Sequence, residues 1–309
     1  MSPDIKLLQA EVDRLQHAQM ATATEKGYAH DFRTFRRWCQ SANRQWLPAT
    51  PETLNLFIVD QLRAKKVVTV CRYACGVAFV HRREGFPSPV DESVHKTLRG
   101  ARRTRAEQPR QMRPLSIAQL RKVAAALKGT PVALRDRAIV LVGFSTALRR
   151  INLAQLRLED LTFCEEGFCV LVKREKQNRE GTAGRIVAVP FGKNRITCPV
   201  RTVQAWLKIR GRGPGPLFTR LDNASGAIDS LSANAIGNIV KQAIAAAGID
   251  ARQTGTHSLR SGFICEAGIA GVSTLLIAAH VGHKSVESTA RYFRPGRLFR
   301  ANCAGLVGL

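Results

Sequence analysis

Two segments, GTHSLR at residues 255–260 and HVGHKSVESTARY at residues 280–292, decide how the rest of this chain is interpreted. They place imidazoles, a guanidinium and a phenol in a stretch whose apolar spacing predicts helices. His257 and Arg260 are three positions apart, so on a helix they share one face. This set of side chains suits a phosphate group, because cations stabilise both a phenolate and the charge that develops on phosphorus.

The spacing of these residues resembles that of the tyrosine recombinases, the phage integrase family. The chain has H-x-x-R at residues 257–260, G-H at 282–283 and Tyr292 nine residues after that histidine. The resemblance implies an arginine and a lysine upstream, which TALR at residues 146–149 and Lys176 match. It implies six catalytic residues: Tyr292 as nucleophile, Arg149, Lys176, His257, Arg260 and His283.

The resemblance also implies a role for each side chain. Arg149 and Arg260 would hold the scissile phosphate, and Tyr292 would attack it and become joined to the 3′-phosphate. Lys176 would protonate the leaving 5′-oxygen. His257 would help to deprotonate the tyrosine or hold the phosphate, and the second histidine would donate a hydrogen bond to it. No metal and no cofactor is expected.

Two positions differ from the family pattern. Family members often have a glycine before the Leu-Arg pair and an acid three residues after the arginine, where this chain has Ala147 and Asn152. Arg150 therefore stays open as an alternative first arginine. Lys173 stays open as the alternative to Lys176, because both lie in the same basic stretch.

The charge of the chain indicates a polyanionic partner. Its 309 residues include 48 Lys and Arg against 23 Asp and Glu, a formal net charge of +25. The resemblance implies that this partner is double-stranded DNA, bound by a homodimer on one site and by a homotetramer at synapsis. The residues of the N-terminal third expected to contact DNA are Arg33, Arg36, Arg37, Arg72, Arg99, Arg102 and Arg103.

Cysteine use and hydropathy indicate the compartment. The eight cysteines form no C-x-x-C pair with zinc spacing and lie mostly in apolar patterns, which is typical of free thiols in a reducing cytosol. The sequence shows no signal-peptide pattern and no apolar run of about 18 residues. We therefore expect a cytoplasmic, nucleoid-associated protein with no membrane partner.

Length and patterning predict two domains in a mainly α fold with a small antiparallel β-sheet. Residues 15–104 are expected to form a helical, SAM-like core-binding domain, similar to that of the family, after a leading helix or tail at 1–14. A basic linker at 105–114 would lead to an α+β catalytic domain at 115–309. The apolar tail beyond Tyr292 would pack on its own domain or on a neighbour.

Local signals place the elements of the first domain. Thr50 and Pro51 mark an N-cap and a first helical residue. Residues 67–83 are rich in β-branched side chains and taken alone could be a strand, but their length and apolar spacing favour a helix. From Leu98 to Arg113 the chain is rich in arginine and poor in apolar residues, which predicts a linker.

The segment from Leu161 to Pro190 predicts the β-sheet. Apolar runs at 161–164 and 168–172 flank a turn at 165–167, and a third run at 185–189 forms the returning strand.

Three classes of function fit these observations. The first is a site-specific recombinase of the integrase type, which uses a 3′-phosphotyrosine intermediate without metal or ATP and serves a mobile element or replicon dimer resolution. The second is a catalytically silent DNA-binding or accessory protein of the same fold, against which the six intact positions argue. The third is a type IB topoisomerase-like relaxing enzyme, which the separate N-terminal domain and the apolar tail disfavour.

Overall fold

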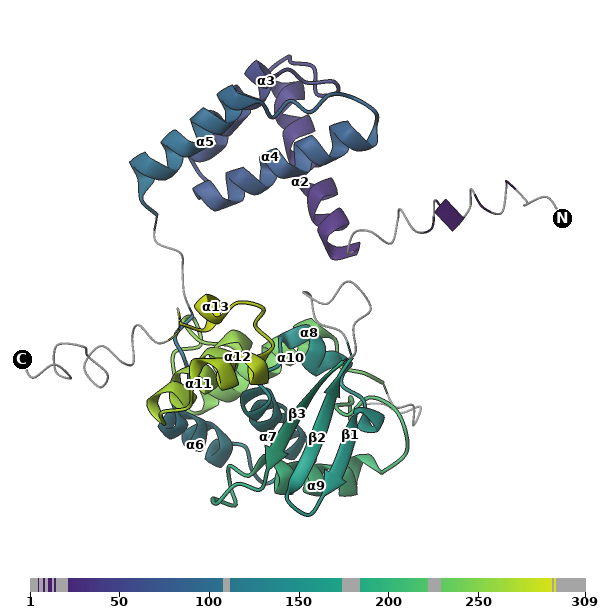
Figure 1. Ribbon diagram of the computed structural model, residues 1–309, viewed down its shortest axis with the longest axis vertical. Coiled ribbons are helices and arrows are strands. Elements are labelled where there is room, and N and C mark those ends of the chain that lie inside the picture. The colour runs from purple at the N-terminus through teal and green to yellow at the C-terminus, as the bar shows by residue number, and fades with distance from the viewer. Residues whose placement is uncertain are drawn as a thin grey trace, which may run out of the picture. The chain divides into compact units, whose positions relative to one another are not determined.

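The computed structural model describes residues 22–107, 112–173, 184–221, 229–290 and 292, with isolated positions between residues 5 and 14. This part of the chain is mainly helical and holds one small antiparallel β-sheet, so the predicted fold class is confirmed (Figure 1). Most of the expected leading helix and the whole tail beyond Tyr292 lie outside the described residues. Among the described helices, none is both long and apolar enough to cross a membrane.

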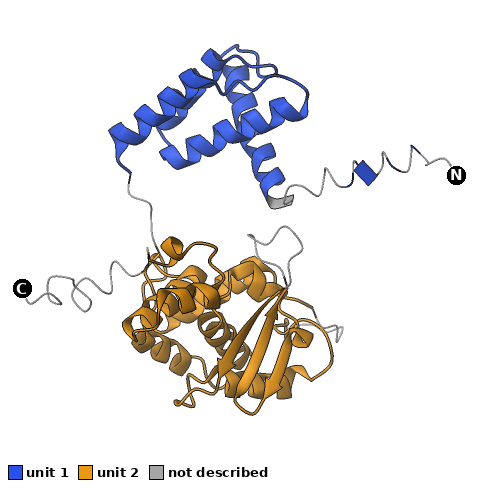
Figure 2. Cartoon of the chain, viewed as in Figure 1, with its two compact units in different colours: residues 1–110 blue, residues 111–309 orange. Residues whose placement is uncertain are grey.

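The chain divides into two compact units, Met1–Arg110 and Gln111–Leu309 (Figure 2). Each unit has its own apolar core, which includes Phe35 and Phe57 in unit 1 and Trp206 in unit 2. The break between the units falls inside the basic stretch that the sequence marks as a linker.

Unit 1 is a helical bundle in its described residues. Its helices are α2 (Thr22–Ser41), α3 (Pro51–Leu62), α4 (Val67–Arg83) and α5 (Glu92–Arg105). Thr50 caps α3 ahead of Pro51, and residues 67–83 form a helix and not a strand, as predicted. Aromatic contacts hold the bundle together, since Phe35 and Phe57 lie edge to face with ring centroids 5.1 Å apart.

The helices α2 and α4 approach closely at Gly76. A Cβ at this position would lie 2.9 Å from the Cβ of Asp31. The buried carboxylate of Asp31 accepts a hydrogen bond from Arg72 Nη2 at 2.9 Å. Burial raises the pKa of Asp31, and the guanidinium of Arg72 opposes this shift. Arg72, which the sequence assigns to DNA contact, is therefore also held against α2.

One expectation about unit 1 is wrong. The arginine-rich stretch that begins at Leu98 is not a linker at its start, because α5 continues to Arg105. Arginine is a good helix former, and Leu98 and Ala101 are buried on the inner face of this helix. Basic residues in the last turn also interact favourably with the negative end of the helix dipole. Composition alone therefore does not separate a basic linker from a basic amphipathic helix.

Unit 2 combines a small sheet with helices. Its elements are α6 (Ile117–Ala126), α7 (Pro131–Ser145), α8 (Arg150–Gln155), the 3-10 turn η1 (Leu158–Asp160), β1 (Leu161–Cys164), β2 (Gly167–Val172), β3 (Arg185–Pro190), α9 (Pro199–Arg210), α10 (Ala233–Ala246), α11 (Thr256–Ile269), α12 (Thr274–Val281) and α13 (Val286–Ala290). Figure 1 shows the sheet at one edge of this unit.

The three strands pair in the antiparallel order β1-β2-β3, and Val170 lies opposite both Leu161 and Val187. The predicted strands are confirmed, with one difference at the turn. Gly167 belongs to β2, where a Cβ would lie only 2.1 Å from the carbonyl oxygen of Val189. Val172 at the end of β2 pairs with Arg185 at the start of β3, and the predicted catalytic lysine falls between them in the sequence.

Candidate active site

His257 and Arg260 lie on one helix, α11, as their spacing indicated. Its first turn is closed by Ser258, whose Oγ accepts a hydrogen bond from the backbone N–H of Gly255 at 3.0 Å. Arg260 is only 2% exposed and donates from Nη1 to the carbonyl oxygen of Ala147 at 2.5 Å. Because a buried guanidinium is costly without hydrogen bonds, this contact helps to fix where the arginine lies.

Ala147 shapes the turn between α7 and the first arginine. Its φ is +50°, in the left-handed region that residues with a side chain rarely adopt. The Ala147 side chain is nonetheless fully buried, in a small apolar cluster with Ile264, Ile277 and Val281. The glycine that the family often has here and the alanine of this chain therefore meet the same backbone requirement.

Arg149 and Arg150 have different neighbours. Burial, and then the positive charges of Arg260 and Arg149, lower the pKa of His257. Both of those guanidiniums therefore lie near the imidazole. Arg150 instead crosses α10 at Gly237, where a Cβ would lie 3.1 Å from its Nη1. This arrangement favours Arg149 over Arg150 as the first arginine of the site.

Tyr292 lies between two histidines of its own chain. Its hydroxyl oxygen is 3.3 Å from Nε2 of His257, and its ring is nearly parallel to the imidazole of His283, with centroids 6.0 Å apart. The backbone of the tyrosine is held as well. Its carbonyl oxygen accepts a hydrogen bond from Cys265 Sγ at 3.2 Å, and its N–H donates to the carbonyl oxygen of Thr289 at 3.0 Å. The structure thus brings together the side chains of both opening segments.

The Thr289 side chain holds the ring of His283. Its Oγ1 atom is 2.7 Å from Nδ1 of His283, and Thr289 is fully buried. A hydroxyl that donates to Nδ1 keeps the proton of a neutral imidazole on Nε2, where it can reach another acceptor. Thr289 was not among the predicted residues, because a single threonine in a short helix carries no signal in the sequence.

His280, also missed in the sequence, links three elements. Its Nε2 is 2.9 Å from the carbonyl oxygen of Ser145 at the end of α7, and its ring stacks on Phe263 of α11 with centroids 4.5 Å apart. Arg185, the first residue of β3, donates to the His280 carbonyl oxygen. Burial lowers the pKa of His280, although its hydrogen bond to Ser145 opposes this shift. These contacts join α12 to β3, α7 and α11 beside the site.

A cavity of about 380 Å³ lies between the start of α8, α10 and the start of α11. Its charged lining side chains are all basic: Arg149, Arg150, Lys241 and Arg260, with His257 beside them. No carboxylate is among the described residues that line it. A larger cavity of about 610 Å³ opens at Arg135, but Asp136 already pairs with that arginine at 2.7 Å. The smaller cavity is therefore the better candidate for an anion.

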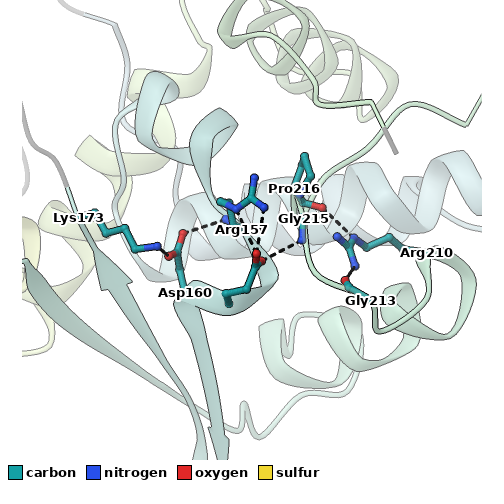
Figure 3. Close-up of polar contacts among 8 residues, drawn as sticks. Arg157, Asp160, Lys173, Arg210, Gly213, Gly215 and Pro216 are labelled. Atoms are coloured by element: carbon teal, nitrogen blue, oxygen red, sulfur yellow. Dashed lines mark hydrogen bonds and ion pairs between the residues drawn. The ribbon is translucent and has the colours of Figure 1, made fainter. Parts of the chain in front are cut away.

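The predicted lysine, Lys176, lies outside the described residues. Its alternative, Lys173, forms an ion pair of 2.5 Å with Asp160, whose side chain is 6% exposed (Figure 3). Asp160 also accepts a hydrogen bond from the backbone N–H of Arg157 at 3.0 Å. A lysine engaged in this way is less suited to give its proton to a substrate. The contact therefore favours Lys176.

The arginines predicted to contact DNA in unit 1 are all exposed. They are Arg33, Arg36 and Arg37 on α2, Arg72 on α4, and Arg99, Arg102 and Arg103 on α5. Two of them already bind carboxylates, since Arg72 pairs with Asp31 at 2.9 Å and Arg99 with Glu92 at 2.5 Å. Their contact with DNA stays a prediction.

In the described residues, no group of three or more His, Cys, Asp and Glu side chains could hold a metal ion. The site instead gathers guanidiniums, imidazoles and a phenol from elements distant in sequence. Together with the fold, this defines an enzyme that breaks and rejoins DNA strands, of the class of tyrosine recombinases. The model of the phage integrase family matches residues 113–297, and the chain belongs to this family.

Individual proteins agree with this assignment. The integrase/recombinase XerD homolog of Selenomonas ruminantium is 30% identical over 301 residues, which cover 96% of this chain and 88% of the relative. The XerH recombinase in a post-cleavage complex with its palindromic difH substrate has the same fold, with a TM-score of 0.68 at 18% identity over 92% of this chain and 79% of that chain. A lambda integrase tetramer bound to a Holliday junction has a TM-score of 0.62 at 15% identity, over 92% and 76% of the two chains.

Proposed function

We propose that this protein is a site-specific recombinase of the integrase type, which cuts and rejoins double-stranded DNA through a 3′-phosphotyrosine intermediate. The observation that carries the proposal is the position of the Tyr292 hydroxyl, which lies 3.3 Å from Nε2 of His257. His257 lies on α11, the helix that also carries the buried Arg260. Family membership supports recombination as the overall reaction. The geometry supports the assignment of side chains to its steps.

Two guanidiniums bind the scissile phosphate in this mechanism. Arg149 and Arg260 hold its non-bridging oxygens, because a guanidinium offers paired donors and stays ionised. Phosphorus becomes five-coordinate as Tyr292 attacks, and negative charge grows on these oxygens. The arginines stabilise that charge in the transition state. As proposed, the reaction needs no metal ion, since the guanidiniums supply the positive charge.

The tyrosine proton passes to His257. Burial and the charges of the two arginines lower the pKa of this histidine, so its Nε2 is neutral and able to accept a proton. His283 donates from Nε2 to a phosphate oxygen while the Thr289 hydroxyl donates to its Nδ1. Lys176 gives a proton to the departing 5′-oxygen, because an alkoxide is a poor leaving group.

Bond formation and bond breaking balance in each step. The bond between phosphorus and the Tyr292 oxygen forms as the bond between phosphorus and the 5′-oxygen breaks. The phosphotyrosine keeps the phosphodiester linkage, so a 5′-hydroxyl from a second duplex reverses the same step and no ATP is needed. The proton that Lys176 supplied on cleavage returns to it on rejoining.

The proposed partner is double-stranded DNA, bound by a homodimer on each site and by a homotetramer at synapsis. The net charge of +25 and the exposed arginines of unit 1 suit a polyanion. The likeness of fold to the lambda integrase tetramer on a Holliday junction supports the assembly. Leu275 and Leu276 on α12 are strongly exposed, and such apolar side chains suit a subunit contact. The place of action is then the nucleoid.

Covalent trapping tests this function. The protein is incubated with supercoiled DNA that carries the sequences flanking its own gene and with a nicked genomic library, and each mixture is denatured in detergent. Wild-type protein is expected to yield protein-linked DNA, whereas Tyr292→Phe yields none. An adduct that persists in Tyr292→Phe refutes the role of the tyrosine. Tight binding with no adduct on either DNA favours a catalytically silent DNA-binding protein.

A further inference from the structure

We propose that Arg150 and Lys241 form a second phosphate site, which binds the DNA phosphate next to the scissile one. The inference rests on the proposed function. It concerns two cations outside the six catalytic positions, both of which line the same cavity as Arg149 and Arg260.

The size and charge of this cavity suit more than one phosphate. Its volume of about 380 Å³ is within the range of about 300–1,000 Å³ typical of pockets for whole small molecules. The catalytic Arg149 and Arg260 lie near His257, whose pKa they lower. Arg150 and Lys241 add two positive charges along α8 and α10, and no carboxylate of the described lining neutralises them.

Glycines lie beside both added cations. Gly237 lies inside α10, where glycine costs about 0.5–1 kcal/mol relative to alanine. A Cβ there would lie 3.1 Å from Nη1 and 3.2 Å from Cδ of Arg150, so the glycine lets this side chain cross the helix. Lys241, one turn further along α10, passes beside Gly255, and its Cε lies 3.8 Å from a Cβ built there. Because Arg150 packs against α10 at Gly237, its side chain loses less conformational entropy when it binds an anion.

The geometry of DNA brings a second phosphate to these cations. One strand of B-DNA carries a phosphate about every 3.4 Å along the helix axis. We infer that, when the scissile phosphate lies at Arg149 and Arg260, a neighbouring phosphate of the same strand reaches Arg150 and Lys241, because all four side chains line one cavity. Such a contact positions the backbone and does not read bases, so it applies to every sequence.

The test is the salt dependence of DNA affinity. Fluorescence anisotropy of two labelled duplexes of unrelated sequence gives the slope of log K against log salt for the wild type, Arg150→Gln and Lys241→Gln. Each variant is expected to reduce the slope by up to about 0.9, equally on both duplexes, because each removes one of the two cations that hold the second phosphate. Lys208→Gln, which removes an exposed charge on α9 outside the cavity lining, is the control and keeps the wild-type slope.

Gly237→Ala separates the position of Arg150 from its charge. This variant keeps every cation but requires the Arg150 side chain to shift by a few tenths of an ångström, so it is expected to reduce the slope by no more than Arg150→Gln does. Its thermal unfolding is expected to match or exceed that of the wild type, because alanine favours a helix. A slope that stays at the wild-type value in Arg150→Gln and in Lys241→Gln overturns the proposal. A loss confined to one duplex also overturns it, because that outcome indicates base contact.

A chemical substitution locates the contact. Once the sequenced adducts give the cleavage position, duplexes with one neutral methylphosphonate at either neighbouring phosphate are compared. At one of the two phosphates, the neutral substitution is expected to weaken binding by the wild type more than binding by Arg150→Gln, because the variant has already lost part of that contact. If the methylphosphonate lowers the DNA affinity of the wild type and of Arg150→Gln equally at both phosphates, the assignment is overturned. A wild type that forms no Tyr292-dependent adduct counts against the proposed function, whereas unchanged slopes in a protein that forms it overturn the second site alone.

Discussion

Replacing Thr289 with valine should slow DNA cleavage without unfolding the protein. Valine has nearly the shape of threonine but lacks the hydroxyl that lies 2.7 Å from His283 Nδ1. Thr289 is fully buried, so no water replaces the lost partner readily. Without that partner, the imidazole is free to carry its proton on Nδ1 and to present a lone pair to the phosphate instead of a donor.

The size of the effect follows from the cost of an unmet hydrogen bond. Leaving one buried polar atom without a partner costs about 1–3 kcal/mol. If this cost falls on the transition state, the cleavage rate drops roughly 5- to 150-fold, since about 1.4 kcal/mol corresponds to a factor of ten. The effect is smaller than the loss expected for removing His283 itself, because the imidazole is still present.

The assay is single-turnover formation of the covalent adduct at saturating DNA, which excludes changes in affinity. Thr289→Ser keeps the hydroxyl and should stay within a few-fold of the wild type, and thermal melts of all three proteins check the fold. Nitrogen NMR of the His283 side chain gives a second readout, with the proton on Nε2 in wild type and Thr289→Ser and a mixture in Thr289→Val. Equal rates for valine and wild type, or a serine variant as slow as valine, would refute the reasoning.

Three further outcomes are expected. The pKa of His257 is lowered, by burial first and then by two neighbouring arginines. The rate of single-turnover cleavage should therefore stay constant down to about pH 6.5 and fall only below that pH. A rate profile with its midpoint above about pH 6.5 contradicts the assignment. Because of the same shift, the folded chain binds fewer protons than the unfolded chain. The stability due to His257 is therefore present above about pH 6.5 and is lost as the pH falls through the lowered pKa. Urea unfolding at several pH values measures this loss. Gly262→Ala should lower the unfolding free energy by about 3 kcal/mol and the melting temperature by about 6–12 °C, because a Cβ would lie 2.2 Å from the carbonyl oxygen of Leu115; a melt within about 2 °C of wild type counts against that packing. Lys176→Met should slow cleavage by about 10²–10⁴-fold. Its rate should recover on DNA with sulfur as the leaving atom, because that leaving group needs no general acid. Lys173→Met should change the cleavage rate little, and the reverse pattern would assign the acid to Lys173.

The sequence predicts those parts of the candidate site that consist of side chains at a regular spacing. His257 and Arg260 share a helix face because of their spacing, and the strands around the β2–β3 connection follow from alternating apolar residues and a glycine turn. It does not predict contacts made through backbone carbonyls. Arg185 meets the carbonyl oxygen of a residue 95 positions away, and only the folded chain determines that pair.

The misassigned stretch in unit 1 has a similar cause. Its arginines suggest a solvated linker, but Leu98 and Ala101 supply the few buried positions that a helix in a small bundle requires. Two apolar residues three apart are a weak signal among so many charges. The sequence also could not decide between Arg149 and Arg150. Two adjacent arginines differ only in the neighbours that the fold brings to each of them.

Ala147 limits how this enzyme can vary during evolution. Its left-handed backbone favours glycine, and its methyl group is fully buried in an apolar cluster. We therefore expect drift at this position to favour the two smallest residues. A β-branched residue would strain the backbone and crowd the cluster at once, and it would move the carbonyl that receives Arg260. Homologous chains that differ widely elsewhere should still carry alanine or glycine here, so this position can help to recognise distant members whose other motifs have diverged.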